Sequence, residues 1–129
     1  MSIIFLKQEE ILSVENSMTR SAALNDLEQF VLLALVRLGE DAYGVTIRAE
    51  IEDRARRPVS MAAVYAALDR MKRAGLVTAE KSEPLPERGG RARKYFRLTP
   101  AGSSSLEEAR EAMARMWDGV ELTTDPRTS

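Results

Sequence analysis

The stretch Gly89-Gly90-Arg91-Ala92-Arg93-Lys94-Tyr95-Phe96-Arg97-Leu98-Thr99 decides the fold of this chain. Its two glycines free the backbone for a turn, and the residues after the turn are strand formers of alternating character. The stretch therefore predicts the tip and the return strand of a β-hairpin, with residues 93–98 as the return strand. Residues 76–81 supply the other predicted strand, and positive charge is concentrated on the tip.

Helical patterns fill most of the remaining chain. Polar caps and helix-stopping residues predict four helices. The first is capped by Asn25 or Asp26 and stopped by Gly39, and the second is opened by Tyr43-Gly44 and broken at Arg56-Arg57-Pro58. The third is capped by Ser60 and covers about residues 61–74, and the fourth is capped by Thr99 with Pro100 at its first position. The second carries Val45, Ile47 and Ile51 as its apolar residues. The third is expected to bury Val64, Leu68 and Met71, and to turn Ala62, Tyr65, Asp69 and Arg73 outward.

The order helix, helix, helix, strand, turn, strand, helix indicates a fold that is mainly α with a small β-hairpin. We predict a winged helix-turn-helix plus a C-terminal dimerisation helix. The expected division is an N-terminal extension over 1–20, a DNA-binding domain over 21–99, the dimerisation helix over 100–121, and a disordered tail over 122–129. The extension has three open interpretations, namely a helix, a disordered segment, or sequence upstream of a true start at Met18.

Composition narrows the classes of function. The chain has no cysteine and no histidine, which excludes disulfides and thiol catalysis and removes the commonest general base and metal ligand. We therefore expect no metal, no cofactor and no enzymatic activity. The longest apolar run, residues 30–36, is too short to span a bilayer, and no secretory signal is recognisable. A cytoplasmic location fits these features.

The net charge of -1 hides a strong asymmetry. Residues 54–97 contain twelve Lys or Arg and four Asp or Glu, so this segment carries +8 and the rest carries -9. Clustered cations can replace the counterions condensed on DNA phosphates, whatever the total charge. The segment is therefore the candidate nucleic-acid surface.

The candidate DNA contacts fall into two groups. Residues at the start of the third helix would reach the major groove, and the basic residues would contact phosphate. The full set of candidate DNA contacts is Ser60, Met61, Ala62, Tyr65, Arg70, Arg73, Arg88, Arg91, Arg93 and Lys94. Several of these residues have a plainer alternative, and for Arg70 it is to offset the helix dipole. Tyr65 would then be a half-buried helix residue, Arg73 would pair with Asp69, and the basic hairpin would be a solvated loop.

The last helix carries apolar residues at steps of three and four, which resembles a coiled-coil seam. The candidate dimer contacts are Leu106, Met113, Met116, Trp117 and Val120. Trp117 is also a candidate for stacking on a flat aromatic effector. Tyr43 is a second candidate for walling a ligand site, with packing between the first two helices as the alternative.

Three segments in this order resemble the PadR family of transcriptional regulators: Gly39-Glu40-Asp41-Ala42-Tyr43-Gly44-Val45, then Ser60-Met61-Ala62-Ala63-Val64-Tyr65-Ala66-Ala67-Leu68 leading into Arg73-Ala74-Gly75-Leu76-Val77, and Arg91-Ala92-Arg93-Lys94-Tyr95-Phe96-Arg97-Leu98-Thr99-Pro100-Ala101-Gly102. The resemblance runs from about Leu24 to Trp117. The single short last helix is similar to that of the smaller subgroup, in which this helix makes the dimer.

The resemblance implies a homodimer that represses promoters by binding a near-palindromic operator. It implies that the Tyr65 helix enters the major groove and that the wing reaches the flanking backbone or the minor groove. It also implies that an aromatic effector near the last helix loosens DNA. The long N-terminal extension departs from the family pattern, as does Val45, where a second aromatic is common. The competing interpretations are a MarR-type winged-helix regulator and a winged helix used only for protein–protein contact.

Overall fold

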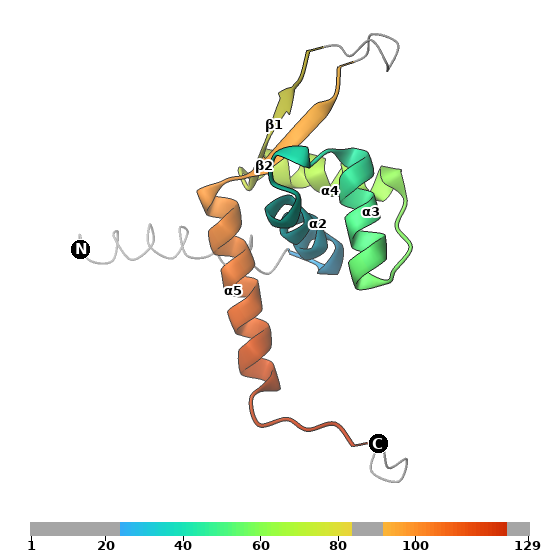
Figure 1. Ribbon diagram of the computed structural model, residues 1–129. Helices are drawn as coiled ribbons and strands as arrows, with labels where there is room; N and C mark the ends of the chain where they lie inside the picture. Colours follow the sequence, from blue (N-terminus) through green and yellow to red (C-terminus); the bar gives the residue numbers. More distant parts are fainter. Residues whose placement is uncertain (1–23, 84–91, 124–129) are drawn as a thin grey trace, which may run out of the picture.

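The computed structural model describes residues 24–83 and 92–123. Helices α2 (Asp26–Leu38), α3 (Gly44–Ala55) and α4 (Met61–Arg73) form a three-helix core, with a short helical turn η1 (Gly39–Asp41) between the first two. The hairpin of β1 (Val77–Lys81) and β2 (Lys94–Leu98) follows, and α5 (Pro100–Trp117) is last. The predicted mainly helical winged fold is thus confirmed. In Figure 1 the hairpin and α5 extend from opposite ends of the core.

Helix α2 begins where the sequence predicts, and its cap has a second function. Asn25 Oδ1 accepts a hydrogen bond from the backbone N–H of Glu28 at 2.8 Å, and Glu28 Oε1 accepts one from the N–H of Asn25 at 2.9 Å. This reciprocal capping box satisfies two donors that the first turn leaves without partners. Glu28 is buried, and its other carboxylate oxygen faces Arg70 of the neighbouring helix α4.

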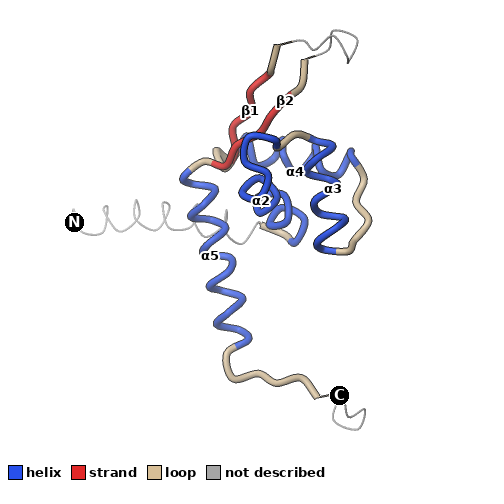
Figure 2. The backbone as a smooth tube through the Cα atoms, viewed as in Figure 1, coloured by secondary structure: helices blue, strands red, loops and turns tan. Residues whose placement is uncertain are grey.

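The hairpin is antiparallel and pairs Val77 with Leu98, Ala79 with Phe96 and Lys81 with Lys94. Because side chains alternate along a strand, these pairs share one face, and Phe96 on that face is buried in the core. The other face carries Glu80 opposite Tyr95. Figure 2 shows the two strands standing out from the helices as a wing. The predicted glycine tip, residues 89–90, lies outside the described residues.

Helix α5 is anchored by its first turn. Thr99 Oγ1 accepts a hydrogen bond from Gly102 N at 3.0 Å and donates one to Gly75 O at 2.7 Å, which joins the helix to the end of α4. Gly102 is buried against the Leu76 carbonyl. The helix ends at Trp117, before the predicted boundary at residue 121, because Asp118 leaves the helical conformation and Gly119 follows with a φ of 76°.

The core confirms most of the predicted burial. Val64, Leu68 and Met71 of α4 are at most 1% exposed, and the four residues expected to face outward are exposed. Of the three apolar residues of α3, Ile47 and Ile51 are buried, whereas Val45 is 61% exposed. Val45 lies two residues from Ile47, about 200° around the helix, and Ile47 is the one that faces the core.

Residues 24–83 and 92–123 form neither a membrane span nor a metal site. No helix there is long and apolar enough to cross a bilayer. No group of three acidic or other metal-binding side chains there is arranged to hold a metal ion.

Candidate nucleic-acid interface

The outer face of α4 is open to solvent and begins at a firm cap. Ser60 Oγ accepts a hydrogen bond from Ala63 N at 3.0 Å. One turn into the helix, Ala62 is exposed and Tyr65 is 45% exposed. The small side chain of Ala62 leaves the helix backbone approachable, as reading of base edges requires.

Tyr65 leans across the start of α3. A Cβ added to Gly44 would lie 2.3 Å from the Tyr65 hydroxyl and 2.8 Å from the Met61 terminal methyl. Only glycine at position 44 leaves room for both side chains. The first residue of α3 therefore sets where the two largest side chains at the start of α4 lie.

Helix α4 and the wing share one surface. A hollow of about 250 Å³ is lined by Tyr65, Leu68, Asp69 and Lys72 from α4 and by Lys94 and Phe96 from β2. The Lys94 ammonium lies 5.6 Å from the centre of the Phe96 ring, a cation–π distance that keeps it on the α4 side of the hairpin. Tyr65, Lys72 and Lys94 are all exposed. The structure thus brings a predicted reading residue and a predicted wing cation together.

Two predicted cations of α4 already have partners. Arg70 Nε lies 3.3 Å from Oε2 of the buried Glu28, which links α4 to the first turn of α2. Arg73 pairs with Asp69 one turn earlier, as the plainer interpretation of that spacing anticipated. Arg70 is half exposed and Arg73 largely exposed, so each keeps surface that a phosphate can reach.

Arg93 lies on the opposite face of the hairpin from Lys94. Its guanidinium carbon is 4.0 Å from the centre of the Tyr43 ring, and its Nη1 donates a hydrogen bond to the Tyr95 hydroxyl at 3.2 Å. That hydrogen bond raises the pKa of Arg93 above its ordinary value, so the side chain stays cationic. Tyr43 therefore packs on the wing, against Tyr95 and Arg93.

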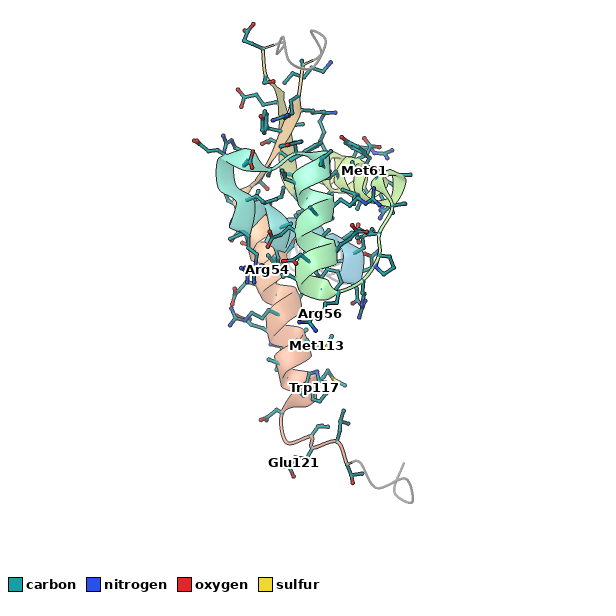
Figure 3. The ribbon with its side chains drawn as sticks, turned by 45° about the vertical axis from the view of Figure 1, so that its right-hand side comes forward. Arg54, Arg56, Met61, Met113, Trp117 and Glu121 are labelled. Atoms are coloured by element: carbon teal, nitrogen blue, oxygen red, sulfur yellow. The ribbon has the colours of Figure 1, made fainter. Side chains whose placement is uncertain are left out.

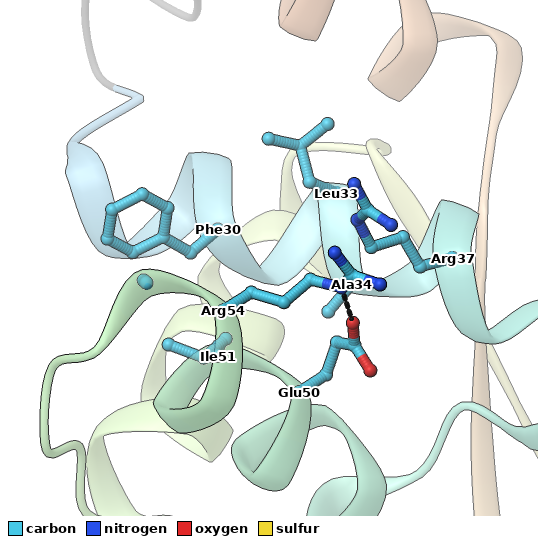
Figure 4. Close-up of a pocket in the computed structure, with 8 residues that line it drawn as sticks. Phe30, Leu33, Ala34, Arg37, Glu50, Ile51 and Arg54 are labelled. Atoms are coloured by element: carbon cyan, nitrogen blue, oxygen red, sulfur yellow. Dashed lines mark hydrogen bonds and ion pairs between the residues drawn. The ribbon is translucent and has the colours of Figure 1, made fainter.

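Not all of the predicted basic segment belongs to this surface. Arg88 and Arg91 lie outside the described residues. Figure 3 shows Arg54 and Arg56 at the end of α3 far from Met61. Figure 4 shows Arg54 in the groove between α2 and α3, where it binds Glu50. The +8 count of residues 54–97 therefore overstates the charge that α4 and the wing present together.

Comparison with known proteins now identifies the fold. The model of the PadR-like family of transcriptional regulators matches residues 32–108, which is more than half of the chain. This chain belongs to the PadR-like family of transcriptional regulators. The predicted resemblance is confirmed, and the alternative assignment to the MarR type is not supported. The family is one of DNA-binding regulators rather than enzymes.

Solved PadR-family structures support the assignment. A PadR-like transcription factor from Bacteroides fragilis is 27% identical, with a TM-score of 0.60 over 82% of this chain and 93% of that one. A PadR-family regulator from Eggerthella lenta is 26% identical, with a TM-score of 0.57 over 88% and 92%. One from Clostridium difficile, 23% identical with a TM-score of 0.61 over 73% and 96%, shares the fold. No curated protein sequence matches this chain significantly.

Within the described part of the chain, the second half of the C-terminal helix keeps large apolar side chains exposed. Leu106 packs on the core, whereas Met113, Met116 and Trp117 are 53%, 76% and 51% exposed. Figure 3 shows Met113 and Trp117 one turn apart on α5. Val120, also predicted for the seam, lies beyond the end of the helix and is 47% exposed.

A groove of about 510 Å³ runs between α2 and α5. Its apolar lining includes Leu33, Leu106, Met113 and Trp117, and its polar residues are Gln29, Glu107 and Arg110. Leu33 is 46% exposed. Tyr43 is not among the lining residues, so the two predicted ligand residues do not share a site.

Proposed function

We propose that this chain is a dimeric repressor that binds a near-palindromic operator, with one α4 and one wing on each half-site. The observation that carries the proposal is the hollow shared by Tyr65 and Lys94, because it makes the reading helix and the wing one surface. A dimer seated on promoter DNA represses by excluding the polymerase. Since promoter DNA is its proposed partner, we place the protein in the cytoplasm.

The proposed contacts differ in kind. Ala62, Met61 and Tyr65 approach base edges in the major groove, while Ser60, Arg70, Arg73 and Lys94 contact phosphate. Arg88 and Arg91 are proposed for the wing tip on sequence grounds alone. Phosphate contacts set affinity and register, and contacts to base edges set the operator sequence.

The proposed dimer forms through α5. The exposed Met113 and Trp117 extend the apolar lining of the α2–α5 groove, and a second copy of α5 would cover both. Loss of water from such a surface is the main driving force for association. Met116 and Val120 would lie at the edge of this interface.

We also propose that a flat aromatic effector stacks on Trp117 in the same groove and loosens DNA. Trp117 is the only tryptophan, so its fluorescence reports the site directly. Titration with acridine should quench that emission and weaken operator binding together. Quenching without any change in DNA affinity would remove the regulatory part of this proposal.

A salt titration tests the proposed DNA binding. With about four to six phosphates neutralised per bound unit, the logarithm of the affinity for mixed-sequence DNA should fall against the logarithm of salt with a slope of roughly -4 to -5. A winged helix used only for protein contact would give a flat slope, or no binding at low salt. That result would contradict the proposal.

A further inference from the structure

The wing is tied to the start of α3 on the face that points away from Lys94. Tyr43 and Tyr95 form an antiparallel bridge, and their rings meet edge to face with centres 5.6 Å apart. Next to them, Phe96 N donates a hydrogen bond to Ala42 O at 2.9 Å. The middle of β2 is therefore paired with the segment that leads into α3.

Arg93 closes this cluster from the side of the wing tip. Its guanidinium lies over the Tyr43 ring at 4.0 Å and near the Tyr95 ring at 6.0 Å, and it donates to the Tyr95 hydroxyl. Its Nε is buried with no hydrogen-bond partner in the described part of the chain. Arg93 is half-buried, and its guanidinium lies against two rings and one hydroxyl, unlike a cation extended toward solvent.

The same cluster leads to the reading helix. Tyr43 caps α3, where its N–H donates to Thr46 Oγ1 at 3.0 Å. Gly44 follows directly, and Tyr65 of α4 rests against it. A continuous set of contacts therefore joins Arg93, Tyr43, Gly44 and Tyr65.

We infer that Arg93 is a positioning residue: by clamping Tyr43 and Tyr95 it holds the wing at the angle that places Lys94 beside Tyr65. This inference rests on the proposed DNA binding. It assigns the two adjacent basic residues of the wing to different tasks. Lys94 neutralises phosphate, and Arg93 fixes where Lys94 stands.

Salt dependence separates the two tasks. Arg93→Ala should weaken binding about tenfold at every salt concentration and leave the salt slope of the wild type unchanged, since no phosphate contact is lost. The matched control is Lys94→Ala on the other face, which should reduce the slope by about 0.9 per subunit. A similar loss of slope in Arg93→Ala would overturn the inference.

Two more measurements test the clamp in other ways: one uses the protein without DNA, and the other compares two variants with their combination. Amide hydrogen exchange of free Arg93→Ala should be faster across β2 than in the wild type, while α2 and α4 keep their protection. Tyr43→Leu should weaken DNA binding as Arg93→Ala does, and the double variant should be no weaker than either one. Unchanged exchange in β2, or additive losses, would contradict a shared clamp. A wild type that binds no DNA would instead refute the proposed function, and the exchange result would stand separately.

Discussion

Trp117→Ala is expected to convert the dimer to monomer and to weaken operator binding in the same step. Trp117 is half exposed on a helix face that also carries Met113, and truncation of a buried aromatic anchor costs an interface about 2–4 kcal/mol. The dimer dissociation constant should rise by about 30- to 1000-fold. Each half-site would then be bound alone, without the gain in effective concentration that a linked second site provides.

Sedimentation equilibrium and operator binding on the same samples check this prediction. Arg115→Ala is the matched control, because Arg115 is exposed and lies about 180° around α5 from Leu106. The control should keep both the dimer and its affinity. A Trp117→Ala protein that dimerises over the same concentration range as the wild type and binds the operator with normal affinity would show that Trp117 does not hold the dimer together.

Gly102→Ala is expected to destabilise the protein by about 2–3 kcal/mol. A Cβ at this position would lie 2.2 Å from the Leu76 backbone oxygen and 2.7 Å from a Leu98 methyl. A carbonyl of the main chain cannot rotate away as a side chain can, so α5 must shift off the core. Helix propensity alone predicts the opposite sign, a gain of about 1 kcal/mol for alanine over glycine. The sign of the change therefore distinguishes packing from propensity.

Urea unfolding of Gly102→Ala beside Ser104→Ala gives the comparison. Ser104 is exposed in the same turn of α5, so its replacement should be neutral or stabilise by a few tenths of a kcal/mol. A Gly102→Ala protein as stable as the wild type would mean that α5 does not approach Leu76 as closely as described.

The sequence predicted the elements well because their signals are local. Asn25, Ser60 and Thr99 each stand just before a run with helical apolar spacing, which predicts a helix cap. All three caps are present in the structure. The α4 core face followed from steps of three and four. Helix ends were harder, since α5 stops at Trp117 although Val120 continues the apolar spacing.

The site was less predictable because it depends on contacts between distant residues. Arg93 and Lys94 are neighbours of the same charge, but side chains alternate along a strand. Arg93 therefore lies against Tyr43, and Lys94 lies on the other face of the hairpin, beside α4. Alternation along residues 93–98 was the available signal for this split. No local sequence pattern predicts that Glu28 is buried against Arg70, which lies 42 residues further along the chain. The charge count along residues 54–97 also assigned Arg54 to the surface of α4 and the wing, although Arg54 lies in the groove between α2 and α3.

Site-directed cleavage of operator DNA tests most directly whether α4 and the wing form one surface presented twice. The chain has no cysteine, so iron–EDTA can be tethered singly to Lys72→Cys on α4, to Lys81→Cys on the wing, and to Glu111→Cys on α5 as a control. We predict that the first two cut within the same half-site, that the pattern repeats symmetrically about the operator centre, and that the α5 tether leaves the DNA intact. Cleavage from only one of the two elements, or equal cleavage from α5, would contradict the account.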